Sequence, residues 1–589
     1  MSHPTPWPML VLAAHALASG WAYAAPAAAH AAAPPEGAHA AASPSGGVAE
    51  KMQRCEQIRL APRRVPEASL PVHRAQAMTS TTAPAVLEFA PAVLSQPKRN
   101  AAPDAIAPLP PAQRERYAHY APNPVHSTAQ QPVSTFSIDV DTGSYANVRR
   151  YLNSGHLPPA DAVRLEEMVN YFSYDWAQPR DGQPFAVHSA VVDSPWQKHA
   201  KLLRIGIKAA EMQAGALPPA NLVFLIDTSG SMDQPGKLDL AQKTVCYFAA
   251  HLRAQDTLTL ITYAGSVGTL LPATAGDRFD AIYSALQQLS AYGSTAGESA
   301  IRMAYDSAEK HFKPKGINRI LLATDGDFNV GISDTQALKS LVADKRNSGI
   351  SLSTLGFGQG NYNDELMEQM ADVGDGNYSY IDQSAEARKV LVRQLSSTLA
   401  TVAHDVKVQV EFNPATVKEY RLVGYENRTL RQEDFNNDRV DAGDIGAGHS
   451  VTALYEFIPQ GAPGWLEPRR YATPHSPTAP KAEAAQPNGA AEYAFIQLHY
   501  KPARGQSSAS MSAPVAQRAV ALDGADADTR FAIAAAAFGQ ALKGGQYNGS
   551  MDWAAIARLA ESARGADPYG ERQGMVELVR KAAALSAAR

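Results

Sequence analysis

Short apolar runs alternate with stretches of helical periodicity between residue 221 and about residue 399. We expect strands at 222–226, 258–263, 319–323, 352–355 and 378–381, and helices at 238–252, 280–289, 300–311, 335–347, 364–371 and 385–398. Strands that alternate with helices of this length pair in parallel and are covered by helices on both faces. The pattern therefore predicts a doubly wound, mostly parallel α/β domain.

Strand-like alternation of apolar and polar positions also occurs on both sides of this domain. The alternating segments are 185–192 and 202–207 before it, and 406–412, 451–457 and 493–500 after it. A few isolated strands bury too little surface to be stable alone. We therefore expect all five to form one β-sandwich, into which the α/β domain is inserted with its two ends close together.

The other folded segments outside the α/β domain are mainly helical. A strand is expected at 133–140, helices at 144–152 and 162–172, and a mostly helical region from residue 530 onward. Changes in composition and periodicity along the chain suggest five parts. They are a signal peptide at 1–24, a disordered Ala/Pro-rich linker at 25–131, an N-terminal flanking domain at 132–215, the α/β domain at 216–400 and a C-terminal domain at 401–589.

The amino terminus has two features of an export signal. An apolar stretch runs from Met9 to Ala18, and Ala22-Tyr23-Ala24 matches the small-x-small pattern of a signal-peptidase site. Because the first Lys or Arg is Lys51, an Ala-rich disordered start or a misplaced initiator methionine is the alternative. Trp21 stands where a bacterial lipoprotein has its lipid-bearing cysteine. We expect a periplasmic or otherwise exported envelope protein, and no later stretch is long and apolar enough for a transmembrane helix.

The amino-acid composition argues against two classes of protein. The 589 residues include 53 Lys plus Arg against 57 Asp plus Glu, which gives a formal net charge of -4, and 45% are hydrophobic. These values argue against a basic nucleic-acid-binding protein and against a highly charged disordered chain. The two cysteines, Cys55 and Cys246, are too few for a disulfide framework, but a single bond between them stays possible.

Oxygen-bearing side chains follow two of the expected strands and precede one of the helices. Asp227, Ser229 and Ser231 form an Asp-x-Ser-x-Ser loop after the first strand, Thr295 precedes the helix at 300–311, and Asp325 follows the strand at 319–323. Open α/β sheets bind ligands just beyond the carboxyl ends of their strands. Carboxylate and hydroxyl oxygens suit a hard cation such as Mg²⁺. We therefore expect three loops to share one metal site.

These loops resemble the metal-ion-dependent adhesion site of the von Willebrand factor type A domain. The resemblance implies that Ser229, Ser231 and Thr295 ligate Mg²⁺, or Mn²⁺ or Ca²⁺, directly or nearly so, and that Asp227 and Asp325 act directly or through water. The flanking segments 136–145, 166–172, 422–428 and 440–446 resemble those of bacterial YfbK-like proteins. That family implies an exported or envelope-associated protein.

Residues 139–144 allow other interpretations. Asp141-Thr142-Gly143-Ser144 matches the aspartic-protease tetrapeptide, but no second copy lies in an all-β context. Asp139-x-Asp141 resembles a phosphatase motif, with Thr142 one position too early. We favour a strand end followed by a helix N-terminus that Thr142 or Ser144 caps, with Gly143 easing the turn.

Two classes of function remain after these exclusions. No phosphate-binding loop or paired zinc-ligating histidines are found, so nucleotide binding and zinc catalysis are unsupported. The first class is a non-enzymatic binding module whose metal accepts a carboxylate from a protein partner. The second is an envelope assembly or structural protein whose metal only stabilises the fold. A chelator should abolish partner binding in the first class and change only the melting temperature in the second.

Overall fold

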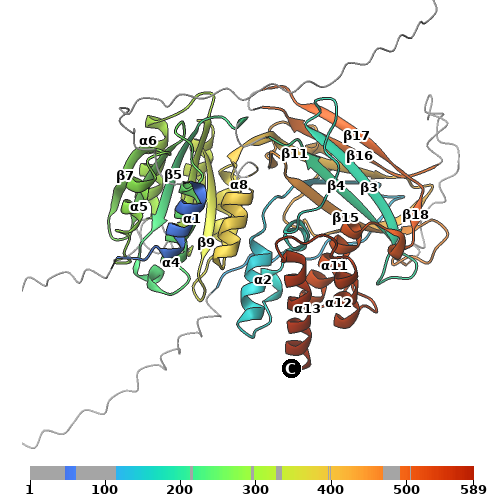
Figure 1. Cartoon of the computed structure of the whole chain (residues 1–589). Coiled ribbons are helices and arrows are strands. Elements are labelled where there is room, and N and C mark those ends of the chain that lie inside the picture. The colour runs from blue at the N-terminus through green and yellow to red at the C-terminus, as the bar shows by residue number, and fades with distance from the viewer. Residues whose placement is uncertain are drawn as a thin grey trace, which may run out of the picture. The chain divides into compact units, whose positions relative to one another are not determined.

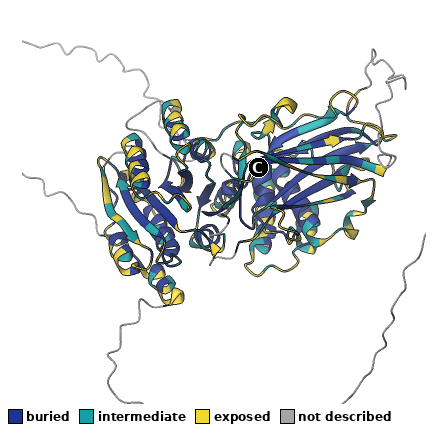
Figure 2. Ribbon diagram, turned by 90° about the horizontal axis from the view of Figure 1, so that it is seen from above, coloured by how far each residue is buried: buried dark blue, intermediate teal, exposed yellow. Residues whose placement is uncertain are grey.

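The computed structural model describes residues 47–61, 115–212, 216–293, 297–326, 335–394, 397, 399–467, 491–503 and 506–588. The expected signal peptide at 1–24 lies outside these residues. Figure 2 shows that the strands are mainly buried, whereas exposed residues gather in loops and on the outer faces of helices.

The α/β domain contains one six-stranded sheet in the order β10-β9-β8-β5-β6-β7. Its strands are β5 (Ala220–Asp227), β6 (Thr257–Tyr263), β7 (Val267–Ala275), β8 (Ile317–Thr324), β9 (Ser351–Phe357) and β10 (Tyr378–Ile381). All neighbours pair in parallel except β6 and β7, which are antiparallel. The predicted mostly parallel sheet is therefore confirmed.

Helices cover both faces of this sheet, as the doubly wound pattern requires (Figure 1). They are α4 (Leu238–Ala249), α5 (Phe279–Leu286), α6 (Gly297–Lys310), α7 (Thr335–Arg346), α8 (Asp364–Val373) and α9 (Ser384–Arg388). Alternate residues of β5 enter different cores, because successive strand side chains point to opposite faces. Phe224 packs in the core that contains α4 and α5, and Leu225 packs in the core that contains α6 and α8.

Two details of this domain differ from the predicted pattern. The strand β7 was not predicted, because it is an edge strand with half-exposed residues and contains Gly268 and Pro272, which are typical of edges. The single helix expected at 385–398 is instead α9 followed by a π-helical turn at Lys389–Arg393.

The flanking strands form two sheets around one apolar core. One sheet has the order β1-β12-β15-β4-β3-β18 and the other β13-β2-β11-β16-β17, with β14 also pairing with β11. The first contains β1 (His126–Ser127), β12 (Val417–Val423), β15 (Ser450–Pro459), β4 (Lys201–Ala209), β3 (Phe185–Asp193) and β18 (Ala519–Val520). The second contains β13 (Thr429–Leu430), β2 (Val133–Ser137), β11 (Thr401–Phe412), β16 (Glu492–Lys501), β17 (Ala509–Ala516) and β14 (Gly443–Gly446).

The five predicted flanking strands are all found in this β-sandwich, which confirms the insertion of the α/β domain. Both ends of the inserted domain meet the same turn before β15. The carbonyl of Ala210, just after β4, accepts a hydrogen bond from Gly448, and the carbonyl of Ala400, just before β11, accepts one from Ala447. The chain therefore leaves and re-enters the sandwich at neighbouring points.

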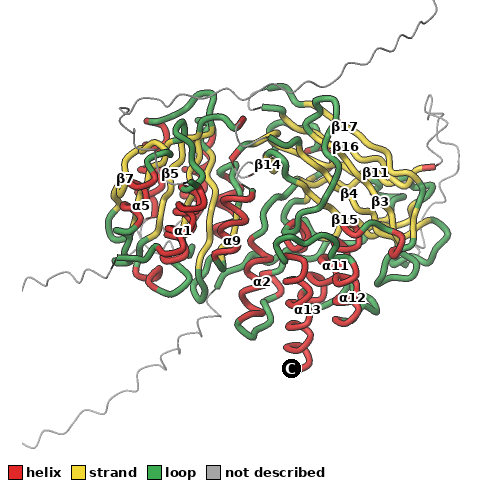
Figure 3. The backbone as a smooth tube through the Cα atoms, viewed as in Figure 1, coloured by secondary structure: helices red, strands yellow, loops and turns green. Residues whose placement is uncertain are grey.

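A helical core joins the two ends of the flanking region. It contains α2 (Gly143–Asn153), α3 (Leu165–Asn170), α11 (Ala527–Leu542), α12 (Trp553–Ser562) and α13 (Glu571–Ala587) (Figure 3). Leu165 and Met168 of α3 pack with Phe531 and Ala535 of α11 in this core. The predicted C-terminal helical region is thus confirmed, and it is stabilised by helices that precede the α/β domain. None of the helices in the described ranges is both long and apolar enough to cross a membrane.

The expectation of a disordered linker at 25–131 is wrong for two stretches. Residues 48–57 form helix α1 (Val48–Gln57), which packs on the α/β domain, and residues 126–127 form β1 in the first sheet of the sandwich. For α1, the reason is its contact with a distant part of the chain. Cys55 and Ile58 are fully buried in the α/β core, and this burial is not visible in the local Ala/Pro-rich composition.

Candidate functional site

The sheet register brings the two predicted acidic ligands to one edge. β5 and β8 are parallel neighbours with Ile226 opposite Ala323, so Asp227 ends β5 at the level where Thr324 ends β8. The hydroxyl of Thr324 donates a 2.7 Å hydrogen bond to Oδ2 of Asp227. Asp325 follows directly, and both carboxylates are fully buried. The carboxyl ends of these strands therefore hold both acids together, as predicted.

The loop after β5 turns two hydroxyls toward each other. Oγ of Ser229 and Oγ of Ser231 lie 3.0 Å apart. The loop is fixed because the amide of Ser229 donates to Oδ1 of Asp227 at 2.9 Å, and the amide of Gly230 donates to the carbonyl of Gly293 at 3.0 Å. Through this bond, Gly293 lies against the loop that follows β5. Thr295 itself lies outside the described residues.

Burial sets the charge state of the acid at the centre of this edge. Burial and the neighbouring carboxylate of Asp325 raise the pKa of Asp227 to about 6, against the hydrogen bonds from Ser229 and Thr324. Because this value is below neutral pH, Asp227 is mainly ionised there and provides a negative charge with two fixed oxygens.

A lysine that the sequence reasoning missed belongs to the same edge. Nζ of Lys237 lies 2.9 Å from Oδ2 of Asp325 and 2.8 Å from Oδ1 of Asn361. Asn361 also donates to Oδ2 of Asp325 at 3.2 Å. One signal was available: Lys237 precedes the first residue of α4, and a cation at a helix N-terminus is unfavourable unless something compensates it.

This edge has the donor set of a hard-cation site. It combines the carboxylates of Asp227 and Asp325 with the hydroxyls of Ser229 and Ser231, all of them oxygen donors. Across the described part of the chain, no three His, Cys, Asp or Glu side chains are arranged to hold a metal ion. A cation site at this edge would therefore need the serine hydroxyls as well as the acids, and the metal site itself stays a prediction.

The interpretation of residues 139–144 as a capped helix start is only partly right. Helix α2 does begin at Gly143, but the side chain of Thr142 makes no capping hydrogen bond. Ser144 instead donates to the carbonyl of Ala162 at 2.7 Å and accepts from the amide of Arg164 at 2.9 Å. Gly143 is needed for packing rather than for a turn, because a Cβ there would collide with the ring of Tyr378. For Ser144 and Gly143, the physical reason for the difference is a tertiary contact.

Several buried acids lie next to this segment. Oε2 of Glu166 accepts a 2.8 Å hydrogen bond from the amide of Tyr425, and Oε2 of Glu167 accepts one of 2.7 Å from the amide of Ser144. Burial, followed by the charges of Glu426 and other nearby acids, raises the pKa of Glu166 to about 8. Burial and nearby acids, of which Asp139 is the first, raise the pKa of Glu167 to about 7, against the attraction of the Arg164 guanidinium.

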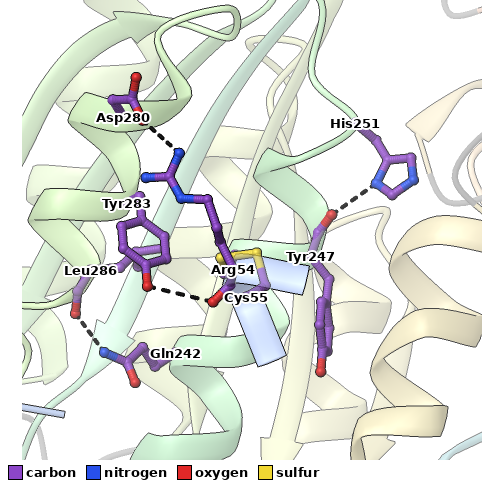
Figure 4. Close-up of a disulfide and its surroundings, with 9 residues drawn as sticks. Arg54, Cys55, Gln242, Tyr247, His251, Asp280, Tyr283 and Leu286 are labelled. Atoms are coloured by element: carbon purple, nitrogen blue, oxygen red, sulfur yellow. Dashed lines mark hydrogen bonds and ion pairs between the residues drawn. A yellow bond between two sulfur atoms is a disulfide. The ribbon is translucent and has the colours of Figure 1, made fainter. Parts of the chain in front are cut away.

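A disulfide between Cys55 and Cys246 fixes α1 to α4 (Figure 4). Polar contacts surround it: Nη1 of Arg54 lies 2.7 Å from Oδ1 of Asp280, and its guanidinium stacks over the ring of Tyr283, 4.5 Å from the ring centroid. The single bond left open by the sequence is therefore formed. The disulfide thereby holds α4, the helix that Lys237 precedes.

Comparison with known proteins identifies the family. Three family models match: "von Willebrand factor" at residues 111–204, "von Willebrand factor type A domain" at 221–394, and "Uncharacterized protein YfbK, C-terminal" at 397–585. YfbK of Escherichia coli (strain K12) is 45% identical over 472 residues, which are 79% of this chain and 80% of that protein. This chain belongs to the YfbK family.

Two further similarities are more distant. Inter-alpha-trypsin inhibitor heavy chain H3 of Mesocricetus auratus is 27% identical over 259 residues, which are 40% of this chain and 28% of that protein. The solved structure of a von Willebrand factor type A protein from Catenulispora acidiphila is 16% identical, covers 69% of this chain and 91% of that chain, and has a TM-score of 0.37. For this YfbK-family chain, the von Willebrand factor type A domain indicates a protein-interaction module in general terms.

Proposed function

We propose that this protein is a non-enzymatic, metal-dependent protein-binding module of the bacterial cell envelope. The observation that supports this function best is the 3.0 Å approach of the Ser229 and Ser231 hydroxyls beside the buried carboxylates of Asp227 and Asp325. No general base with a free approach to this edge has been identified among the described residues. We therefore favour binding over hydrolysis.

Each residue of this edge would have a defined role in holding Mg²⁺, or Mn²⁺ or Ca²⁺. Ser229, Ser231 and Thr295 would ligate directly or nearly so, and Asp227 and Asp325 directly or through water. A bound divalent ion would supply Lewis acidity toward a carboxylate oxygen of a protein partner. Thr324 and the amide of Ser229 hold the Asp227 carboxylate in place, so this carboxylate is already oriented for binding.

The disulfide supports the envelope location. Disulfides persist in oxidising compartments such as the periplasm and are rare in the reducing cytosol. Cys55 and Cys246 are joined in the folded protein and both are fully buried. This observation agrees with the export signal suggested by the first 24 residues.

A second candidate is a structural role, in which the metal only stabilises the fold. The two functions separate in a capture experiment with envelope extract, using wild type, Ser229→Ala and Asp325→Ala, each with Mg²⁺ or with chelator. Ser284→Ala, at an exposed serine of α5, is the matched control. We expect Mg²⁺-dependent capture by wild type and the control only, with unchanged circular dichroism. Capture that survives chelator and both site substitutions leaves the structural role instead.

A further inference from the structure

The ammonium of Lys237 is placed where a cation is intrinsically unfavourable. Lys237 is only 1% exposed and directly precedes the first turn of α4. Burial and the positive end of the helix therefore both oppose the charge of its ammonium. The compensation is local. Asp325 accepts from Nζ at 2.9 Å and Asn361 accepts from it at 2.8 Å. Because a buried ammonium at a helix N-terminus is unfavourable without such partners, we take its positive charge to have a function.

The chain after β9 is shaped around this lysine. Gly358 has a φ of +80°, and a Cβ there would collide with Cγ, Cδ and Cε of Lys237. Only glycine is therefore suited to this position, both for its backbone conformation and for the space it leaves. The carbonyl of Gly358 is in turn held by the hydroxyl of Tyr380. Three loops, following β5, β8 and β9, thus enclose the ammonium and its two partners.

Lys237 changes the charge of the candidate metal site. The carboxylates of Asp227 and Asp325 alone would neutralise a divalent ion, but the ammonium of Lys237 offsets one of them. Among the described residues of this edge, the two carboxylates and the ammonium together then carry one net negative charge. With a divalent ion bound, the site would keep one net positive charge, in a region where the acids and the lysine are fully or almost fully buried. Such a site attracts anions and disfavours neutral oxygen ligands.

We infer that Lys237 is the specificity-determining residue of this site, and that it selects an anionic ligand, the carboxylate of an acidic protein segment. This inference rests on the proposed metal-dependent function. Lys237 lowers the affinity for the metal ion, because like charges repel, and raises the affinity for the anion. Its removal must therefore change the two affinities in opposite directions, which loss of a purely structural residue would not do.

The test measures both affinities on the full chain. Wild type, Lys237→Met, Lys237→Gln and Lys243→Met are compared, the last removing a lysine from the same helix. Mn²⁺ affinity is measured by calorimetry, and capture on immobilised poly-glutamate and poly-glutamine is measured at saturating Mn²⁺. We expect both Lys237 variants to bind Mn²⁺ about tenfold more tightly and poly-glutamate about tenfold more weakly than wild type, with Lys243→Met unchanged.

Each other outcome decides between the two claims. Wild type that binds no Mn²⁺ overturns the proposed function, and this inference with it. Wild type that binds Mn²⁺ while the variants change neither affinity, or change both in the same direction, overturns the role of Lys237 alone. If both variants fail to fold, wild type still provides a test: equal capture on poly-glutamate and poly-glutamine overturns the inference.

Discussion

Cys55 and Cys246 lie 191 positions apart and are joined by a disulfide, so a helix from the Ala/Pro-rich region is covalently fixed to the α/β domain. Both sulfurs belong to fully buried residues of the same apolar core, which also contains Ile58 of the same segment and Leu286 of α5. The bond closes a long loop. In the chain-entropy account, long loops give the largest stabilisation, because the cross-link restricts the unfolded chain.

We predict that replacing both cysteines by serine lowers the free energy of unfolding by about 2–5 kcal/mol. The measurement is urea denaturation of the full chain under oxidising conditions. Reducing agent should bring wild type close to the Cys55→Ser/Cys246→Ser variant and leave that variant unchanged. If reducing agent affects both proteins equally, the disulfide is not the source of the difference.

Local pattern was sufficient for the central strands and for the acids that follow them. The apolar runs at 222–226 and 319–323 correspond to β5 and β8, and their parallel pairing brings Asp227 and Asp325 to one edge. Lys237 could not be assigned in the same way. Its environment depends on Gly358 and Asn361, more than a hundred positions later. Periodicity predicts which strands pair, but it does not predict which side chains of the later loops reach one another.

The same limit explains the other errors. Helix α1 is stabilised by burial of Cys55 against a distant helix, and Ser144 bonds to residues 162 and 164 rather than capping its own helix. Edge strand β7 has too weak an alternation to be recognised. In each case a tertiary contact determines a structure that the local sequence leaves open.

The hydroxyl of Thr324 provides a sharper test of how the metal edge is built. It donates to Oδ2 of Asp227 at 2.7 Å and accepts from the amide of Gly326 at 3.1 Å. Thr324→Val removes both bonds with little change of shape. We predict a loss of about 1.5–3 kcal/mol of stability, because one partner is a buried carboxylate, and a weaker affinity for Mn²⁺.

Thr259 of β6 is the matched control for this substitution. It is also a buried threonine of the same sheet, and its hydroxyl has no hydrogen-bond partner among the described residues. Thr259→Val should therefore leave the urea midpoint unchanged or raise it slightly. Equal destabilisation by the two valine variants would contradict a special role for the bond between Thr324 and Asp227.

The insertion of the α/β domain predicts how fragments behave. In a fragment of residues 132–215, strand β4 lacks β15, with which it pairs from Lys201 to Lys208, and α3 lacks the C-terminal helix α11. We predict that this fragment alone shows no cooperative thermal transition by circular dichroism. Co-expression with residues 216–589 should recover a soluble complex. A cooperative transition of the isolated fragment would show that the flanking parts fold independently.

The buried acid Glu166 predicts a dependence of stability on pH. Burial raises the pKa of Glu166 to about 8 in the folded protein, whereas an exposed glutamate has a pKa of about 4.3. Between these values the folded protein holds a proton that the unfolded chain has released. The resulting stability is fully present below about pH 4.3 and is lost as the pH rises through about 8.

Glu166→Gln isolates this contribution, because its amide is neutral at every pH and its oxygen can still accept from the amide of Tyr425. Between pH 6 and pH 8, we predict that wild type loses up to about 3 kcal/mol more stability than the variant, since each pH unit is worth at most about 1.4 kcal/mol. Urea denaturation at pH 6, 7 and 8 measures the difference. Glu433→Gln, at an exposed glutamate, should follow wild type at all three values. Parallel curves for wild type and Glu166→Gln would mean that Glu166 is already ionised at pH 6, so that burial and the charge of Glu426 do not raise its pKa enough to hold a proton there.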